Sequence, residues 1–331
     1  MRAVLSQAPG GPETLCVEEI PDPEPKARDV LVRVHACGVN YPDTLLIRDL
    51  YQVKPTRPFS PGAEIAGIVE AVGSDVRGFA PGDRVIGRLG WGGMADKLLV
   101  PAGRLTHMPP QMSMEEGATF LFTYATSYYA IKDCGRAKTS ETMLVLGASG
   151  GVGSAACAIG QALGLRVLAA TSSPTKLDFA MKNGAEDGVI YPAALEASEV
   201  RNVSSSFRSI GGARGIDIVF DAVGGQYSEA ALRSLNPGGR HLVVGFAAGI
   251  SSMPLNLPLL KSCSIVGVNW RQLTVDEPER NVANTQALLD LYVAGKLRPI
   301  ISARYSLEKA GDAIALLDSR RASGKVVVNL V

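Results

Sequence analysis

Over the first third of the chain, short runs of apolar and β-branched residues alternate with turns that contain proline and glycine. Residues 30–35 (VLVRVH) and 64–72 (EIAGIVEAV) are two such runs. Short runs of this kind, separated by frequent turns, are typical of strands in an antiparallel sheet. The pattern therefore predicts a mostly antiparallel β-domain that reaches to about residue 124.

From about residue 142 the pattern changes to apolar runs that are followed by glycine-rich turns and amphipathic stretches. This order is typical of a parallel sheet with crossover helices, and it predicts a doubly wound α/β domain that binds a nucleotide. The expected strands are 142–147, 166–170, 188–190, 216–221, 241–245 and 264–268, and the expected helices are 152–163, 174–183, 226–235 and 282–294. A helix at 307–318 and a strand at 325–330 follow, and we expect this last part of the chain to return to the first domain.

Length and composition agree with two domains. The chain has 331 residues, of which 46% are hydrophobic, and this is about twice the length of a single domain. A net charge of +1 argues against a nucleic-acid-binding protein. No apolar run is long enough for a signal peptide or a membrane helix, so we expect a cytoplasmic protein without a membrane anchor.

Residues that bind transition metals are few and scattered. The five cysteines form no CxxC pair, and none of the three histidines has a cysteine or another histidine at the spacing of metal ligands. We therefore expect reduced, buried cysteines and no metal site.

The strongest motif is the segment 142–153 (TMLVLGASGGVG), in which a strand runs into glycines and then into a helix. In such a loop Gly150 lets the backbone approach a pyrophosphate, Gly153 lets helix and strand pack closely, and the helix N-terminus supplies amide groups to the phosphates. Ala148 occupies the position of the first glycine in the GxGxxG pattern, and the alternative to phosphate binding is a plain tight turn. The residues expected at the phosphates are Ala148, Ser149, Gly150, Gly151, Val152 and Gly153.

The end of the second parallel strand indicates which nicotinamide cofactor is bound. Sites specific for NAD place a carboxylate there, on the ribose 2′-hydroxyl. Here no acidic residue occurs from Arg166, at the start of this strand, up to Asp178. The hydroxyls and the lysine in this segment suit a 2′-phosphate, which favours NADPH. In the alternative interpretation, Ser172 and Ser173 cap the next helix and Lys176 is solvated. The residues expected near the 2′-phosphate are Thr171, Ser172, Ser173 and Lys176.

Four segments together make the chain resemble the medium-chain dehydrogenase/reductase superfamily. They are 37–43 (CGVNYPD), 61–67 (PGAEIAG), 82–85 (GDRV) and the glycine loop. The resemblance implies a GroES-like β-rich catalytic domain at 1–124 and 269–331 and a Rossmann NADPH-binding domain at 125–268. It also implies that nicotinamide and substrate meet in a cleft between these domains.

The resemblance extends to one branch of that superfamily. Its zinc-dependent members carry cysteine and histidine ligands at the positions of Asn40 and Ala63, and neither residue can replace them at a tetrahedral zinc site. The chain therefore resembles the zinc-free quinone oxidoreductases. Glu64, next to a lost ligand position, is interpreted as structural.

In quinone oxidoreductases the residues that match Asn40, Asp43 and Tyr51 line the substrate side of the cleft. Asn40 would donate a hydrogen bond to a quinone carbonyl that gains negative charge, and Tyr51 would donate similarly or move a proton. Two alternatives stay open from the residues alone: Asn40 is a turn amide bonded to the backbone, and Asp43 is a helix cap.

The resemblance implies further contacts with the cofactor. Thr126, in the segment around Tyr124, would flank the nicotinamide, and residues 245–247 would pass over it. Tyr191 would lie near the adenosine phosphate, and Trp270 would lie either at the mouth of the site or in an interface. The residues involved are Thr126, Tyr191, Gly245, Phe246, Ala247 and Trp270, with Lys325 and Asn329 as weaker candidates.

Three functions are compatible with these features. The first is hydride transfer from NADPH to a quinone or a similarly conjugated carbonyl, which needs no metal. The second is reduction of an enoyl thioester or another activated alkene, with Tyr51 assisting protonation. The third is a nucleotide-sensing relative with little turnover. Relatives of this kind usually form homodimers, and residues 264–268 would then pair as an apolar edge strand.

Overall fold

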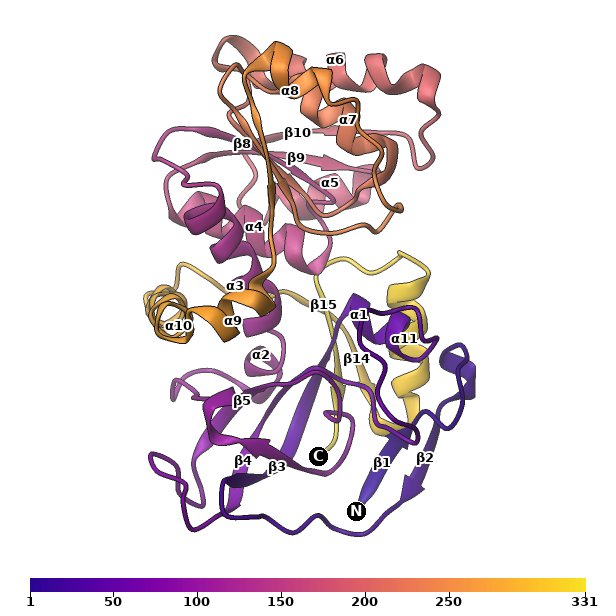
Figure 1. Cartoon of the computed structure of the whole chain (residues 1–331), viewed down its shortest axis with the longest axis vertical. Helices are drawn as coiled ribbons and strands as arrows, with labels where there is room; N and C mark the ends of the chain where they lie inside the picture. Colours follow the sequence, from indigo (N-terminus) through magenta and orange to yellow (C-terminus); the bar gives the residue numbers. More distant parts are fainter. The chain divides into compact units, whose positions relative to one another are not determined.

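The computed structural model describes residues 1–331 and divides the chain into two units (Figure 1). The first unit contains residues 1–122 and 298–331, and the second unit contains residues 123–297. Residues 269–297, which we expected in the first domain, therefore belong to the second unit. The reason is local, because Arg280 and Asn284 bind the carboxylate of Asp133 at 2.7 and 2.6 Å.

The first unit is built around a sheet in the order β14-β15-β3-β4-β5-β7, with β6 paired to β3. Its strands are β3 (Asp29–Val39), β4 (Glu64–Val72), β5 (Arg84–Arg88), β6 (Lys97–Pro101), β7 (Leu105–His107), β14 (Ile301–Ser306) and β15 (Lys325–Asn329). All of its pairs are antiparallel except β14 with β15. A separate antiparallel pair joins β1 (Arg2–Leu5) to β2 (Cys16–Glu19). The predicted β-rich domain is confirmed.

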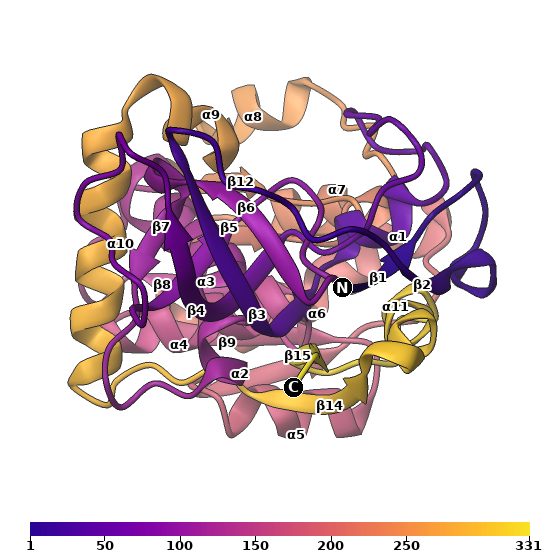
Figure 2. The same cartoon turned by 90° about the horizontal axis from the view of Figure 1, so that it is seen from below.

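The last part of the chain completes this sheet. β15 lies between β14 and β3, and its Val328 stands opposite Cys37. The strands β14 and β15 run side by side in Figure 2, with the C-terminus next to β15. Val326 and Val328 are buried in the core, together with Ala313 and Ile314 of the helix α11 (Ala310–Asp318). Two short helices, α1 (Tyr41–Leu46) and α2 (Met114–Gly117), complete the unit.

The second unit contains a six-stranded sheet in the order β10-β9-β8-β11-β12-β13, in which every pair is parallel. Its strands are β8 (Thr142–Leu146), β9 (Arg166–Thr171), β10 (Asp187–Ile190), β11 (Ile218–Asp221), β12 (Arg240–Val243) and β13 (Ser264–Gly267). This is the strand order of dinucleotide-binding folds, in which ligands bind beyond the carboxyl ends of the strands where the order reverses, here between β8 and β11. Every residue of β8 is buried, as expected for a strand covered on both faces. The predicted Rossmann fold is confirmed.

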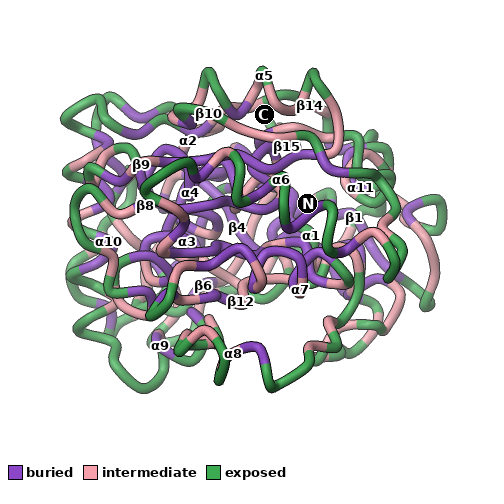
Figure 3. Tube along the Cα trace, turned by 90° about the horizontal axis from the view of Figure 1, so that it is seen from above, coloured by how far each residue is buried: buried purple, intermediate pink, exposed green.

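Helices precede, connect or follow these strands along the chain. They are α3 (Leu121–Tyr128), which continues into a π-helix (Tyr129–Cys134), α4 (Gly151–Ala162), α5 (Pro174–Met181), α6 (Val200–Gly211), α7 (Gly225–Ser234), α8 (Asn256–Lys261), α9 (Trp270–Asp276) and α10 (Pro278–Val293). The sequence did not lead us to expect α3, α6, α8 or α9. In α6 four serines lower the helix propensity, and the buried stripe of Val200, Val203 and Phe207 stabilises the helix instead. In Figure 3 buried segments follow inner strands such as β8 and β9, whereas much of α8 is exposed.

The helices also bear on the expectation about membranes. α10 is the longest of them, with 16 residues. A helix needs about 20 predominantly apolar residues to span a bilayer. None of the helices combines the length and the apolar character of a membrane-spanning segment.

Candidate active site

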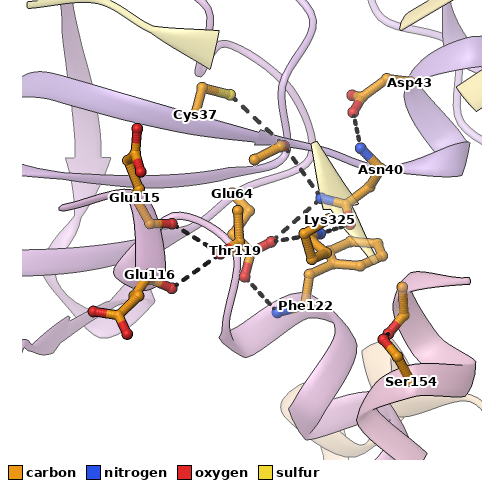
Figure 4. Close-up of polar contacts among 12 residues, drawn as sticks. Cys37, Asn40, Asp43, Glu64, Glu115, Glu116, Thr119, Phe122, Ser154 and Lys325 are labelled. Carbon is orange, nitrogen blue, oxygen red and sulfur yellow. Dashed lines mark hydrogen bonds and ion pairs between the residues drawn. The ribbon is translucent and has the colours of Figure 1, made fainter. Parts of the chain in front are cut away.

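A buried polar cluster lies in the first unit, around Glu64 at the start of β4 (Figure 4). Oε1 of Glu64 accepts a hydrogen bond from the backbone N–H of Phe122 at 2.7 Å. Oε2 lies 3.3 Å from Nζ of Lys325 and 3.4 Å from Nδ2 of Asn40. Strand register brings these residues together, because Glu64 pairs with Gly38 and Val326 pairs with Val39. Side chains from two strands, β4 and β15, and from the loop after β3 thus converge within the protein.

Asn40 is held through both ends of its carboxamide. Oδ1 accepts a hydrogen bond from Nζ of Lys325 at 2.5 Å, and Nδ2 donates to the carbonyl oxygen of Gly38 at 3.3 Å. The side chain is only 4% exposed. The contact with Gly38 is the kind of backbone bond expected of a turn amide, whereas the contacts with Lys325 and Glu64 are with side chains.

Asp43 stabilises the start of α1. Oδ2 accepts from the backbone N–H of Asn40 at 2.8 Å, and Oδ1 accepts from the backbone N–H of Gly62 at 3.0 Å. This is the geometry of a capping residue in the third position of a helix, where the side chain reaches back to the N-cap residue. Burial raises the pKa of Asp43 to about 6, although the two backbone donors oppose this shift.

The electrostatics of the cluster are dominated by burial. Burial also raises the pKa of Glu64, against the opposing effect of the Lys325 ammonium. Asp43 and Glu64 are fully buried carboxyl groups, and Lys325 is the cation that lies against one of them. Nowhere in the structure do three or more His, Cys, Asp or Glu side chains gather as a metal ion would require. Tyr51 lies in the bend after α1, half-buried against the core of the first unit.

In the second unit, the glycine loop joins β8 to α4. Gly147 has a φ of +69°, which favours glycine. A Cβ on Gly153 would lie 2.1 Å from the carbonyl oxygen of Gly147, so this position must be glycine for α4 to pack on the strand. A Cβ on Gly150 would instead meet nothing closer than 3.4 Å. No atom of the protein therefore requires glycine at position 150. This agrees with an open space beside Gly150 that a ligand could occupy. The other expected members, Ala148 and Ser149, are buried in the loop.

The N-terminus of α4 provides the amide groups that a phosphate would need. The helix begins at Gly151, and its N-cap residue, Gly150, has no side chain to satisfy the first amides. Gly151 and Val152 form the first turn. The positive end of a helix of 12 residues stabilises an anion placed there. The loop therefore fits a pyrophosphate.

The end of β9 combines a helix cap with a separate pair of polar side chains. Oγ of Ser173 accepts from the backbone N–H of Lys176 at 3.4 Å, so Ser173 is the N-cap of α5. Nζ of Lys176 donates to Oγ of Ser172 at 3.3 Å. Thr171 is buried and donates to the carbonyl oxygen of Ser173. The cap interpretation thus describes Ser173, while Ser172 and Lys176 form a donor pair at the end of the strand.

Tyr191 is an inward-facing residue beside the glycine loop. Its ring lies 4.7 Å from that of Tyr227 and 6.5 Å from that of Phe207, measured between centroids. Burial raises the pKa of its phenol, and a hydrogen bond with the backbone of Gly147 opposes that shift. Tyr191 therefore supports the loop from within the core.

Asp221, at the end of β11, was not recognised from the sequence. Its Oδ1 accepts from the backbone N–H groups of Val223 and Gly224, both at 2.9 Å. Its Oδ2 accepts from Oγ of Ser228 and lies 3.1 Å from Nε2 of His241. Burial is the largest single influence and raises the pKa of Asp221, but the contacts with His241, Ser228 and the N–H of Gly224 together outweigh it, so the pKa is lowered. An acidic residue at the carboxyl end of a predicted parallel strand was the available signal.

The segment after β12 packs on the loop that Asp221 holds. Ala248 donates its N–H to the carbonyl oxygen of Val223, and Gly225 donates to the carbonyl oxygen of Gly249. A Cβ on Gly224 would lie 2.4 Å from that same oxygen of Gly249. The expected residues Gly245, Phe246 and Ala247 belong to this segment, and the Phe246 ring is half-exposed.

The two remaining expected contacts lie on helices. Thr126 is half-buried on α3, and the neighbouring Ser127 donates its hydroxyl to the carbonyl oxygen of Val152 at 2.9 Å. Trp270 begins α9 and donates its indole N–H to Oδ1 of Asn281 at 2.9 Å. Trp270 is 8% exposed and belongs to the second unit.

Two family models match the chain. The model described as alcohol dehydrogenase GroES-like domain covers residues 26–110, within the first unit. The model described as zinc-binding dehydrogenase covers residues 151–286, within the second unit. The two matches agree with the β-rich fold of the first unit and the parallel sheet of the second.

Individual relatives match over nearly the whole chain. Human quinone oxidoreductase is 34% identical over 100% of this chain and 98% of its own length. Quinone oxidoreductase-like protein 2 of Bos taurus is 34% identical over 96% of this chain and 89% of its own length. Among solved structures, the quinone oxidoreductase of Escherichia coli complexed with NADPH is 26% identical, with a TM-score of 0.90 and full coverage of both chains.

Proposed function

This chain belongs to the medium-chain dehydrogenase/reductase superfamily as an oxidoreductase, and we propose that it is a zinc-independent reductase that passes hydride from NADPH to a quinone or a similarly conjugated carbonyl. The observation that carries the proposal is a pair of hydrogen-bond donors at the end of β9, in which Nζ of Lys176 lies 3.3 Å from Oγ of Ser172. NAD-specific sites hold a carboxylate at this position instead. The full-length similarity to proteins named quinone oxidoreductases supports the choice of acceptor.

The residues of the second unit fit NADPH. The uncapped first turn of α4 and the open space at Gly150 suit a pyrophosphate. The Lys176 ammonium and the Ser172 hydroxyl suit a 2′-phosphate, because both donate and one is positively charged. The complexes of relatives with NADPH support the same choice.

Zinc independence is supported by what the cluster contains. The superfamily's ligand positions hold Asn40 and Ala63 here. Nζ of Lys325 lies 2.5 Å from Oδ1 of Asn40, so a cationic donor already uses the one oxygen that Asn40 could offer a metal. A second cation at that oxygen would be repelled by the first.

When bound, NADPH supplies a hydride, and a quinone that accepts it takes up one proton to become the hydroquinone. In our proposal Asn40 orients the carbonyl oxygen through Nδ2, whose two bonds inside the protein are long, at 3.3 and 3.4 Å. Tyr51 donates to the same acceptor or passes the proton to it. Asp43 holds the turn that carries Asn40.

We include a homodimer in the proposal. β13 ends the order of its sheet, so one of its edges is free to pair with a second copy. Leu255, Leu259 and Leu260, directly before β13, are each more than 70% exposed. Exposed apolar groups beside a free edge favour a self-complementary contact. A cytoplasmic location is part of the proposal as well, since all five cysteines are free thiols, as a reducing compartment would keep them.

The experiment is NADPH oxidation by purified protein after EDTA treatment, followed by absorbance. Benzoquinone, phenanthrenequinone and crotonyl-CoA are tested in parallel, with NADH as the comparison. We expect turnover of the quinones, a preference for NADPH and no loss on chelation. Turnover of crotonyl-CoA alone would assign the chain to the enoyl reductases, and loss of activity with EDTA would refute zinc independence. Tight NADPH binding without any turnover would indicate a nucleotide sensor.

A further inference from the structure

The ion pair of Glu64 and Lys325 contacts two features that matter for the proposed reaction. On one side lies the carboxamide of Asn40, and on the other lies the first turn of α3. We propose that this pair positions both: Lys325 sets the direction of the Asn40 carboxamide, and Glu64 holds the start of the helix by which the chain passes from the first unit to the second. The first half rests on the proposed function, since Asn40 is its substrate-side amide.

The contact with Lys325 determines how the amide of Asn40 points. An ammonium group only donates hydrogen bonds, so the atom of Asn40 that lies 2.5 Å from Nζ is the carbonyl oxygen. Nδ2 then faces the carbonyl oxygen of Gly38 and Oε2 of Glu64. Both bonds are longer than the usual value of about 2.9 Å. The short contact between Lys325 and Oδ1 therefore fixes the direction of Nδ2 from the other end of the carboxamide. Nδ2 itself makes only long hydrogen bonds, so it remains able to donate to a substrate carbonyl.

Glu64 acts on α3 through its other oxygen. Phe122 is the second residue of α3, and the first amides of a helix have no partner within the helix. Oε1 of Glu64 satisfies the amide of Phe122 at 2.7 Å, and a negative charge at this end of a helix is favourable. The two units divide directly after Phe122. Further along α3, the hydroxyl of Ser127 binds the first turn of α4.

Stability alone does not account for such a pair. The side chains of Glu64 and Lys325 are 1% and 4% exposed, and burying two charges costs desolvation energy that their attraction often fails to offset. Apolar replacements of buried ion pairs are often neutral or stabilising. Ala66 and Val327 lie two positions further along the two strands, on the same face of the sheet, and are fully buried apolar residues, so the surroundings would suit an apolar pair. Gly38 is required by the backbone nearby, since a Cβ there would lie 2.0 Å from the carbonyl oxygen of Ala118, and that Cβ would also lie 3.1 Å from Oε2 of Glu64.

Two double variants separate the roles. Lys325→Met with Glu64→Gln removes both charges but keeps an oxygen for the amide of Phe122. Lys325→Met with Glu64→Leu removes both charges and that oxygen as well. Lys309→Met, which removes a cation that is 67% exposed, is the control. The measurements are the melting temperature, the Kd for NADPH, kcat and KM with benzoquinone, and hydrogen exchange at the backbone amide of Phe122 and the side-chain amide of Asn40.

We expect both double variants to fold and to bind NADPH within about twofold of the wild type, while kcat falls by about tenfold or more, as for a misdirected hydrogen-bond donor. The Asn40 side-chain amide should exchange faster in both. The Phe122 amide should exchange faster only in the variant with leucine at position 64. The Lys309→Met control should match the wild type throughout.

Each half of the proposal can be overturned separately. Unchanged exchange at Asn40, or unchanged kcat in a quinone-active enzyme, would refute the role of Lys325. Unchanged exchange at Phe122 in the leucine variant would refute the role of Glu64. If the wild type reduces no quinone, the proposed function fails, and the exchange measurements still decide whether the pair positions these two amides.

Discussion

Gly153 faces the carbonyl oxygen of Gly147 so closely that a Cβ on Gly153 would lie 2.1 Å from that oxygen, whereas a Cβ on Gly150 would meet no atom closer than 3.4 Å. Two glycines of one motif are thus present for different physical reasons. Gly153 allows α4 to pack on β8, and Gly150 leaves space for a ligand in front of the loop. Substitutions at the two positions should therefore affect different properties, stability at Gly153 and cofactor binding at Gly150.

The first prediction uses that pair. Gly153→Ala should destabilise the protein by about 2 kcal/mol or more, because backbone must move to relieve the overlap. Gly150→Ala should melt close to the wild type, since its φ of −73° suits alanine, but should bind NADPH at least about tenfold more weakly. Thermal melting and fluorescence titration with NADPH check the two results. Equal loss of stability in both variants would contradict the assignment.

The second prediction concerns cofactor choice. Lys176→Ala should raise the KM for NADPH by about tenfold and leave that for NADH unchanged, because in the proposed complex the lost ammonium would bind only the 2′-phosphate, which NADH lacks. Lys182→Ala changes an exposed lysine directly after the same helix and should alter neither value. Steady-state kinetics with both cofactors provide the measurement. A parallel rise for NADH would mean that Lys176 acts through the fold of α5.

The third prediction is a pH dependence of stability from Asp43. Its pKa is raised to about 6 from 3.8, so the native state holds its proton more tightly than the unfolded state does. The stabilisation is complete below pH 3.8 and is lost as the pH rises to about 6. It amounts to about 3 kcal/mol at most. Urea unfolding at a series of pH values should show this slope in the wild type and not in Asp43→Asn. The exposed control Asp312→Asn should keep it.

The fourth prediction tests the role of Asp221. Asp221→Asn should lower the free energy of unfolding by about 3 kcal/mol and weaken NADPH binding, because it disturbs a buried pair that orders two loops. Since the pKa of Asp221 is lowered, its contribution is present above the unfolded pKa and is lost on acidification through the folded one. Ser251→Ala removes only the outer hydroxyl of the network and should cost less than about 1 kcal/mol. A stable Asp221→Asn protein with normal NADPH binding would refute this role.

The fifth prediction concerns the homodimer. A side chain on Gly267, in β13, would extend into open space, so Gly267→Asp should leave the protomer folded. It should nonetheless give monomers, because charges would meet across the paired edges. Gly90→Asp also places a side chain in open space, but in the first unit, and should remain dimeric. Light scattering at micromolar concentration distinguishes the masses. A monomeric wild type would refute the proposed dimer directly.

Features encoded by neighbouring residues were predictable from the sequence. The strand, glycine loop and helix of 142–162 follow from local spacing, and the change of pattern near residue 142 indicated the parallel sheet. α6 was missed, because its buried stripe lies among serines and only tertiary contacts stabilise it.

The polar cluster depends on strand register and could not be derived from spacing. Lys325 and Asn40 are 285 positions apart and meet only because β15 pairs with β3. Similarity to a family suggested both residues, but it did not reveal that one binds the other. The same holds for Asp221 and His241, which face each other across neighbouring strands. In each case the pairing of strands, rather than the residue type, creates the contact.

The position of β15 has a consequence for the order in which the protein is made. The second unit is one continuous stretch, 123–297, and all of its strands exist before residue 298 is synthesised. The sheet of the first unit lacks an inner strand until residues 325–329 have left the ribosome. The part of the chain that is translated first must therefore wait for the part translated last, with the edge of β3 at residues 36–39 uncovered in the meantime.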